Sequence, residues 1–335
     1  MNNLTPRIDV SVIIPLYNGA LLLNRCLDSV FNQQTQYTFE VIIIDDGSTD
    51  NSIELIHRRK EKNIVLIQQQ NSGPAIARNN GVKIARGEYC TYLDADDYWL
   101  PEYIEKSINL LKKYPELIAV NTGQKHIIVG KGSKINPEYL ETYSGLKDGF
   151  ILDDFYSFWS KHNHVGTCST TIKTDVLLDS GGQRSDLRIC EDLEFWPYIA
   201  SFGKWGFIPD ILYVSDGGLV QSKYGWNKFI LRFKNILLFN EWFKRLEKKL
   251  TEDQIESIRL QLNGVVLGIS RALISGGQFK RAKVNLGYYK PNGRSNYLLT
   301  FSKYGDVVWY LFAMLYRTYQ YLKINLPMIK SKLSF

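Results

Sequence analysis

Short apolar runs alternate with segments of helical periodicity over the first hundred residues of the chain. Four of the runs are rich in β-branched residues, as in buried strands: Val10–Pro15, Phe39–Ile44, Ile64–Ile67 and Tyr89–Leu93. After each run, apolar residues recur at helical spacing, which predicts helices that begin near Leu22, Ile53, Pro74 and Pro101. This alternation predicts a doubly wound α/β sheet with right-handed crossovers.

The pattern changes twice in the rest of the chain. Short strand patterns at Leu117–Val120, His126–Val129 and Lys204–Tyr213 surround a segment of helical spacing at Gly149–Trp159. From Trp226 onward the spacing of apolar residues is helical throughout. We therefore expect an α/β domain over residues 1–222 and a helical region over residues 223–335.

Clusters that contain polar residues stand at the ends of three of the predicted strands, at Pro15–Asn18, Asp45–Ser48 and Asp94–Asp96. In an open α/β sheet the ligand binds at the carboxyl ends of the strands, so these three segments mark one expected site. The chain contains neither G-x-G-x-x-G nor G-x-x-x-x-G-K-[ST], which argues against the common dinucleotide-binding and P-loop classes.

An acidic cluster follows the fourth predicted strand, where Asp94, Asp96 and Asp97 stand almost side by side. Neighbouring carboxylates repel one another, and a hard cation such as Mg²⁺ or Mn²⁺ relieves that repulsion. Because side chains alternate along a strand, we expect Asp94 and Asp96 to face one point, where a metal ion carrying a diphosphate would fit. The alternative is a solvated strand end in which Asp97 caps a turn or a helix.

The composition suits a globular protein of 335 residues with one large and one smaller domain, or with two domains. The four cysteines form no C-x-x-C pair, so we expect neither a zinc site nor disulfides, and a reducing cytoplasm. No signal-peptide pattern is visible, and no apolar stretch reaches the roughly 18 residues of a membrane-spanning helix. A cytoplasmic location is therefore expected.

Charge is divided unevenly along the chain. Residues 1–222 carry 21 Lys and Arg against 28 Asp and Glu, whereas residues 223–335 carry 20 against 6. This split indicates an anionic partner for the C-terminal region, either membrane phosphates or nucleic acid. The segment Asp306–Ile324 is aromatic and apolar with Arg317 and Lys323, which is typical of an interfacial helix, although the same segment would also suit packing on the α/β domain.

Four motifs occur in order along the first hundred residues: Ser11–Asn18, Val41–Asp50, Asn71–Gly81 and Gly87–Trp99. Together they resemble the family 2 glycosyltransferases, and the likeness covers roughly residues 8–215. The resemblance implies the GT-A fold, a Rossmann-like, doubly wound mixed sheet, here with a C-terminal helical extension. It also implies inverting transfer of a sugar from a nucleotide-sugar, with a UDP-sugar as the expected donor, to a hydroxyl of a saccharide or lipid-linked saccharide. Residues 8–115 would bind the donor and residues 116–222 the acceptor.

The resemblance assigns several residues to the donor base. Pro15 and Tyr17 resemble the residues that flank the base, where an aromatic ring supplies stacking of about 1–3 kcal/mol. Asp46 resembles the acceptor of a hydrogen bond from the uracil ring, and Asp45 is expected to orient the turn. Arg78 resembles the arginine that approaches the base pocket and the acidic cluster; a surface salt bridge is the alternative.

The acidic cluster takes the other donor-side roles that the resemblance implies. Asp94 resembles the contact to the ribose or the donor sugar, with Ala95 beside it. Asp96 resembles the ligand of a divalent metal, Mn²⁺ or Mg²⁺, which would bridge the diphosphate and stabilise the charge on the departing nucleotide.

Attack by an acceptor hydroxyl requires one carboxylate as a general base. Glu191–Asp192, which follows Gly181–Gly182, resembles the family's Glu-Asp pair, so we assign Asp192 as the base with Glu191 in reserve; helix capping is the alternative. Gln183–Ser185 departs from the family pattern of Phe and acidic residues, which bears on the acceptor. His162 and His164 are spaced to share a strand face, where they would line an acceptor cleft, be exposed or reach a metal.

Two rival functions use the same residues differently. A catalytically inactive relative would bind nucleotide-sugar without transferring it, but the intact Asp46, Asp94, Asp96 and Asp192 argue against this. A sugar-1-phosphate nucleotidyltransferase would need a Gly-rich loop with Arg or Lys after the first strand, which this chain lacks. For the basic C-terminal region we expect peripheral contact with anionic lipid on the inner face of the membrane, and no nucleic acid.

Overall fold

The computed structural model describes residues 7–128, 132–136, 140–143, 145–146, 148–187, 189–216, 235–290 and 296–333. The chain forms two compact units. The first comprises Met1–Ser185 and Phe195–Val220, and the second comprises Asp186–Glu194 and Gln221–Phe335. The predicted end of the α/β domain at residue 222 and the predicted helical start at Trp226 lie outside the described residues.

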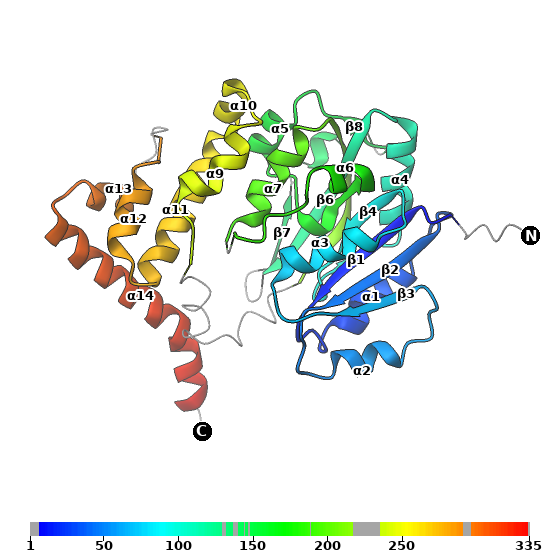
Figure 1. The fold of residues 1–335 in the computed structure, drawn as a ribbon, viewed down its shortest axis with the longest axis horizontal. Coiled ribbons are helices and arrows are strands. Elements are labelled where there is room, and N and C mark those ends of the chain that lie inside the picture. The colour runs from blue at the N-terminus through cyan, green and yellow to red at the C-terminus, as the bar shows by residue number, and fades with distance from the viewer. Residues whose placement is uncertain are drawn as a thin grey trace, which may run out of the picture. The chain divides into compact units, whose positions relative to one another are not determined.

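The first unit is built on one mixed sheet, drawn in Figure 1. Its strands are β1 (Val10–Leu16), β2 (Phe39–Asp45), β3 (Ile64–Gln68), β4 (Tyr89–Tyr92), β5 (Tyr98–Trp99), β6 (Leu117–Ile128), β7 (Gly132–Asn136), β8 (Phe150–Ile151), β9 (Thr170–Lys173) and β10 (Lys204–Ser215). They run in the order β3-β2-β1-β4-β9-β6-β10-β5, with β7 on β6 and β8 on β10. The pairs among β1 to β4 are parallel, whereas β9 is antiparallel to both its neighbours. The predicted mixed, doubly wound sheet is confirmed.

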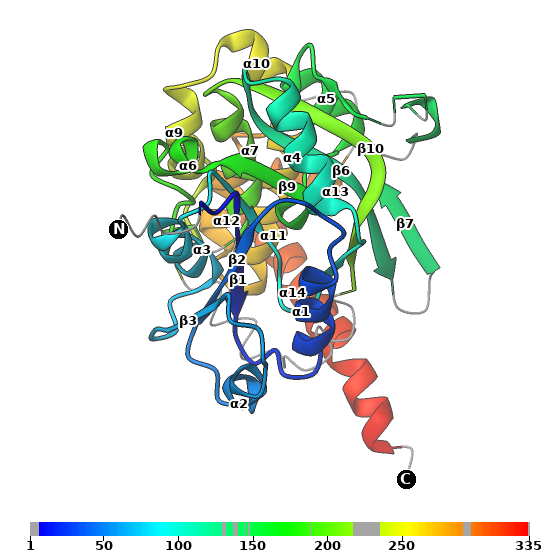
Figure 2. The same ribbon diagram turned by 90° about the vertical axis from the view of Figure 1, so that its right-hand side faces the viewer.

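Helices cover both faces of the parallel strands. Those of the first unit are α1 (Leu23–Phe31), α2 (Ser52–His57), α3 (Pro74–Ile84), α4 (Tyr103–Lys113), α5 (Phe155–His162) and α6 (Thr174–Asp179), and α7 (Glu191–Ala200) crosses the division between the units. In β1 the side chains alternate between two cores: Val12 and Ile14 join the core formed with α1 and α4, whereas Ile13 faces α3. Figure 2 shows α3 on one side of β1 and α1 on the other. The continuous apolar run of β1 thus reflects burial on both sides.

Close packing between α3 and β1 depends on a glycine. A Cβ at Gly81 would lie 2.4 Å from Cγ2 of the buried Ile13. We expect Gly81→Ala to destabilise the protein by about 1–3 kcal/mol, because the added methyl group overpacks the core. Urea unfolding would measure this. Gly264→Ala in a helix of the second unit is the matched control, since nothing lies within 4 Å of its added Cβ and it is expected to be neutral or stabilising. Equal midpoints for Gly81→Ala and the parent chain would contradict the packing argument.

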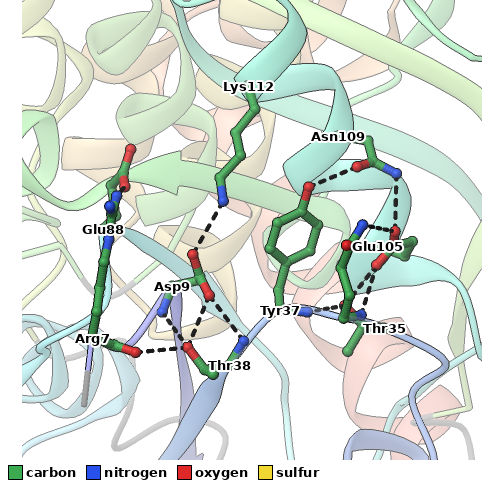
Figure 3. Close-up of polar contacts among 10 residues, drawn as sticks. Arg7, Asp9, Thr35, Tyr37, Thr38, Glu88, Glu105, Asn109 and Lys112 are labelled. Carbon is green, nitrogen blue, oxygen red and sulfur yellow. Dashed lines mark hydrogen bonds and ion pairs between the residues drawn. The ribbon is translucent and has the colours of Figure 1, made fainter.

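Polar side chains at the amino ends of β1 and β2 bind one another and α4 (Figure 3). Asp9 accepts hydrogen bonds from the Thr38 amide at 3.0 Å and from Lys112 Nζ at 3.1 Å. The Tyr37 hydroxyl donates to Asn109 Oδ1 at 2.7 Å. Because these contacts tie α4 to the strands from within the unit, we interpret this edge of the sheet as structural.

The second unit is helical, with α9 (Phe239–Glu247), α10 (Glu252–Ser257), α11 (Arg259–Ser275), α12 (Phe279–Leu286), α13 (Tyr297–Ser302) and α14 (Asp306–Leu333). Thr251 and Gln254 form a capping box at the start of α10. Among the described residues, none of the helices combines the length and apolarity that crossing a membrane requires.

Three local expectations are corrected. The segments predicted as strands at Leu117–Val120 and His126–Val129 belong to one long strand, β6, over its described part. The segment Gly149–Trp159 is not one helix, because β8 occupies its start and α5 begins only at Phe155, behind the Asp154 cap. His162 lies at the end of α5 and His164 beyond it, so the two histidines share no strand face.

Candidate functional site

The three polar segments meet at one edge of the sheet, at the carboxyl ends of β1, β2 and β4. Leu16 at the end of β1 is in register with Asp45 of β2, and the Leu93 amide after β4 donates to the Ile13 carbonyl at 3.0 Å. The chain adds β2 and β3 on one side of β1 and then returns to place β4 on the other. Such a reversal is the topological switch point at which open α/β sheets bind ligands.

Asp46 joins two loops at this edge. Its Oδ1 accepts from Gln69 Nε2 and from the Ser72 amide, each at 2.7 Å, and its Oδ2 accepts from the Gly73 amide at 2.8 Å. The carboxylate is buried. Asp45 is buried as well and accepts from the Ser48 amide at 3.2 Å, and its predicted role in orienting the turn stays a prediction.

The loop after β1 is fixed by the loop after β2. Asn18 adopts a left-handed φ of 52°, and its Oδ1 accepts from the Thr49 amide at 2.7 Å. Its own amide donates to Ser48 Oγ at 2.9 Å. This anchoring leaves the neighbouring Tyr17 ring 45% exposed at the site edge, while Pro15 is half-buried in β1. An exposed ring on a fixed backbone is available for stacking on a flat ligand.

The acidic cluster forms a β-turn, Asp94–Asp97, which we call the acidic turn. The Asp97 amide donates to the Asp94 carbonyl at 3.0 Å, so the backbone reverses here. We predicted that Asp94 and Asp96 face one point because side chains alternate along a strand. That reasoning is wrong, because the strand ends at Tyr92. Arg25 holds the turn through a 2.6 Å bond from Nη2 to the Asp96 carbonyl.

Burial and crowding disfavour negative charge in the acidic turn. Asp97 is buried and accepts from the Tyr213 hydroxyl at 2.5 Å and the Asp216 amide at 2.9 Å. Burial, and next the charge on Asp94, raise the pKa of Asp97 to about 7. Burial and the same neighbour raise the pKa of the half-buried Asp96. The sequence suggested only that Asp97 caps a turn or a helix, whereas in the structure it also binds Tyr213 and Asp216.

Arg78 links the acidic turn to a loop distant in sequence. This buried residue donates from Nη2 to Asp94 Oδ1 at 2.6 Å, so the alternative of a surface salt bridge is wrong. Its Nη1 donates to Gln183 Oε1 at 3.4 Å. Asn79 clamps the Gln183 backbone by accepting from its amide at 2.9 Å and donating to its carbonyl at 2.7 Å. Ala95 is buried within the turn.

Sequence patterns alone did not indicate Arg25 and Asn79 as parts of this site, and they related Gln183 to the acceptor and not to Arg78. Gly182 was the one sequence feature that could have indicated close packing between this loop and Asn79. A Cβ at Gly182 would lie 2.4 Å from Asn79 Oδ1, and the φ of Gly182 is +75°. The Gln183 side chain is buried, and its Nε2 has no hydrogen-bond partner among the described residues. Gln183, where the chain departs from the family pattern, lies beside the ion pair of Arg78 and Asp94.

Some of these residues fit a divalent cation. Among the described residues, Asp94, Asp97 and Cys168 have possible ligand atoms within 4.8 Å of one another. Burial raises the pKa of the Cys168 thiol, which accepts a hydrogen bond from the Asp94 amide and is therefore a poor ligand for a hard cation. The crowded carboxylates of the acidic turn suit Mg²⁺ or Mn²⁺. Asp96 is not part of this group, and its role as metal ligand stays a prediction.

The predicted base lies in the first turn of α7, which carries Glu191, Asp192 and Glu194. Glu191 and Asp192 are half-buried, and Asp192 Oδ1 accepts from the Leu193 amide at 2.9 Å. These residues belong to the second unit, whereas Asp46 and Asp94 belong to the first. Acids at a helix N-terminus are stabilised by its dipole, as the capping alternative requires. The base assignment stays a prediction.

Glu194, the third acid of this turn, has a structural role. It is fully buried, and its Oε1 accepts from Arg245 Nε at 2.7 Å in an ion pair. We expect Glu194→Ala to destabilise the protein by up to about 3–5 kcal/mol, because the Arg245 charge loses its partner, with partial exposure of Arg245 reducing the effect. Thermal and urea unfolding would measure this. The exposed Glu252→Ala is the control, and unchanged unfolding of Glu194→Ala would contradict the assignment.

The two histidines belong to an aromatic cluster. His164 is fully buried, with its ring 4.7 Å from Phe158 and 5.7 Å from Phe207. His162 bonds the Tyr143 hydroxyl at 3.1 Å. Burial lowers the pKa of both imidazoles. Among the described residues, neither histidine belongs to a group that could hold a metal.

Comparison with known proteins places this geometry in a family. The model of "Glycosyl transferase family 2" matches residues 11–176. The poly(ribitol-phosphate) beta-glucosyltransferase of Bacillus spizizenii is 36% identical over 132 residues, covering 38% of this chain and 19% of that protein. The chain spans only 19–42% of the length of three of the curated relatives that it matches.

Two solved structures share the fold. Staphylococcus aureus TarS 1-349 in complex with UDP-GlcNAc aligns with a TM-score of 0.53 at 17% identity, covering 97% of this chain and 92% of that one. The Pyrobaculum calidifontis mannosyltransferase in complex with GDP-Man and Mn²⁺ aligns with a TM-score of 0.53 at 20% identity, covering 98% and 88%. At these identities the likeness establishes the fold alone.

Proposed function

Because the chain belongs to glycosyltransferase family 2, we propose that it transfers a sugar from a nucleotide-sugar donor to a hydroxyl of a saccharide or lipid-linked saccharide, with inversion at the anomeric carbon. One observation carries the proposal: within the matched residues, Asp46, Arg78 and Asp94 gather at the switch point of the sheet. The curated relative named as a beta-glucosyltransferase supports the same class of reaction.

Asp46 and Tyr17 are proposed to bind the donor base. A carboxylate offers about four lone-pair positions, and three of those of Asp46 already accept hydrogen bonds. The remaining position on Oδ2 would accept the ring N–H of a uracil. The exposed Tyr17 ring would stack on that base, with Pro15 beside it. Uracil is the base we propose, and the UDP-GlcNAc complex of TarS 1-349 supports it, whereas the GDP-Man complex makes guanine the competing base to test.

The acidic turn is proposed to bind the diphosphate and the donor sugar. A divalent ion, when bound, would neutralise the diphosphate and stabilise the charge on the leaving nucleotide. Asp96 is the proposed ligand, with Asp94 and Asp97 close enough to share it. Arg78 would hold Asp94 in a fixed direction toward the ribose or the sugar. The Mn²⁺ named with the Pyrobaculum calidifontis enzyme supports a divalent ion here.

Asp192 is proposed to take the proton from the attacking hydroxyl. A general base must be ionised and within hydrogen-bond reach of that proton. Asp192 is half-buried in the first turn of α7, where the helix dipole favours negative charge. Since a metal-bound diphosphate leaves without a proton, one carboxylate is sufficient.

Calorimetric titration of the full chain with UDP, GDP and dTDP tests the donor side of the proposal. Each nucleotide is titrated with Mn²⁺ and again with EDTA. The expected result is binding of UDP that is strong with the metal and weak without it. Preference for another nucleotide would keep the reaction class and replace the donor. Absence of binding by all three would overturn the proposed function, and binding without any transfer from a panel of UDP-sugars would favour an inactive relative.

A further inference from the structure

Among the described residues of the second unit, helix α14 packs one side on α11, α12 and α13. Trp309 and Ala313 are fully buried there, and Trp309 Nε1 donates to the Phe279 carbonyl at 2.9 Å. Phe312 stacks on Phe301 of α13 with ring centroids 4.1 Å apart. Arg317 turns inward as well, donating from Nε to the Ser275 carbonyl of α11 at 3.0 Å. Figure 1 shows α14 running beside α11, α12 and α13. The helix is therefore held along one face between Trp309 and Arg317.

The opposite face is apolar and open. Val307, Leu311, Met314, Leu315 and Leu322, which we call the α14 stripe, are 75%, 59%, 55%, 72% and 44% exposed. Their spacing follows the helical repeat, so they lie along one face of the helix. From 307 to 322 the only charged residue is Arg317, which belongs to the packed face. Exposed apolar surface of this extent marks a site of contact with another body.

The charge of the C-terminal region indicates which partner fits the α14 stripe. From residue 307 to the end of the sequence there is no Asp or Glu, whereas Arg317, Lys323, Lys330 and Lys332 are present. The whole 223–335 region carries 20 Lys and Arg against 6 Asp and Glu, so a second copy docked by the same region would bring like charges together. An anionic lipid surface attracts that charge.

Aromatic residues border the α14 stripe. Tyr310, Tyr319 and Tyr321 are 37%, 58% and 44% exposed on its two flanks. Tyrosines are favoured at the level of lipid headgroups, where the ring is partly buried and the hydroxyl remains in water. A helix with an apolar line, flanking tyrosines and basic residues has the composition of helices that lie in the plane of a membrane interface.

We propose that the α14 stripe docks the chain on an anionic membrane surface, with α14 lying in the interface and not crossing it. Val307, Leu311, Met314, Leu315 and Leu322 would enter the acyl boundary. The net positive charge of residues 223–335 would be attracted by the lipid phosphates. Membrane docking by α14 does not depend on donor binding. The docking proposal can therefore fail while the proposed function stands, and the proposed function can fail while the docking proposal stands.

Vesicle flotation of the full chain tests the proposal. The vesicles contain phosphatidylcholine either alone or with roughly a third of phosphatidylglycerol, in low and high salt. Binding is expected to anionic vesicles and to weaken in high salt. The double variant Leu311→Ser/Leu315→Ser keeps the net charge and removes apolar surface, so its partition coefficient should fall at least about tenfold. Leu178→Ser/Leu260→Ser is the matched control, because it removes two leucines that are 52% and 42% exposed elsewhere.

Folding and self-association are measured on the same samples. Circular dichroism and thermal unfolding would show that both double variants fold, as expected for exposed positions. Analytical ultracentrifugation would give the oligomeric state. Equal vesicle binding by the parent chain and Leu311→Ser/Leu315→Ser would overturn the proposal. Absence of vesicle binding by the parent chain would also overturn it. If the parent chain then forms dimers that Leu311→Ser/Leu315→Ser disrupts, the α14 stripe would be assigned to contact with a second copy.

Discussion

Replacing Asp192 by Asn is expected to lower the rate of sugar transfer by about 10²–10⁴-fold, the usual contribution of a general base. The amide has nearly the shape of the carboxylate but cannot accept a proton at neutral pH. Nucleotide affinity should be unchanged, because the donor contacts proposed here come from residues of the 8–115 segment. Initial rates of donor consumption give the first quantity, and calorimetry gives the second.

Two neighbours in the same helical turn serve as comparisons for that experiment. Glu191→Gln tests the reserve base, and a larger rate loss there than in Asp192→Asn would move the assignment to Glu191. Glu194→Ala shows what loss of a structural acid does, since Glu194 pairs with Arg245. A variant that loses rate only because it unfolds would resemble Glu194→Ala in thermal stability. Full turnover by both Asp192→Asn and Glu191→Gln would place the base elsewhere.

Replacing Asp96 by Ala is expected to remove the metal dependence of donor binding. Loss of an outer-shell partner typically costs 10–100-fold in metal affinity, so loss of a direct ligand should cost more than about 100-fold. The turn itself should survive, because Arg25 binds the carbonyl of Asp96 and not its side chain. UDP titrations with Mn²⁺ and with EDTA should give nearly equal, weak affinities in this variant.

Asp97→Asn separates the two candidate ligands of the acidic turn. Asp97 accepts from Tyr213 and from the Asp216 amide, so its replacement should also lower stability. If Asp96→Ala keeps the normal difference between Mn²⁺ and EDTA while Asp97→Asn loses it, the ligand is Asp97 with Asp94. That outcome would agree with the grouping of Asp94 and Asp97 and would remove the metal role from Asp96.

Local patterns were sufficient for the parallel half of the sheet. The apolar runs near Val10, Phe39, Ile64 and Tyr89 are strands because both of their faces are buried, and such runs contrast sharply with polar loops. The polar segments at their carboxyl ends followed from the same geometry. The four motifs then indicated the family, and the family model that matches residues 11–176 confirms it.

Contacts between distant segments could not be predicted in this way. Arg25 pairs with Asp216, and Arg78 bonds Gln183, across separations of 191 and 105 residues. No periodicity encodes such pairs, because they depend on how loops return to the sheet edge. The strand-alternation argument for Asp94 and Asp96 failed for a related reason: alternation holds only while the backbone is extended, and β4 ends before Asp94.

The loops around the candidate donor site hold one another through side chain–backbone bonds. Asn18 fixes the Thr49 amide, Asp46 fixes the Ser72 and Gly73 amides, and Arg25 fixes the Asp96 carbonyl. A ligand that enters this edge therefore meets backbone already ordered during folding, and little conformational entropy is lost on its arrival. Substitution in any one of these loops would disturb the others. We therefore expect a change in the preference for the proposed donor to come through side chains that make none of these bonds, such as Tyr17.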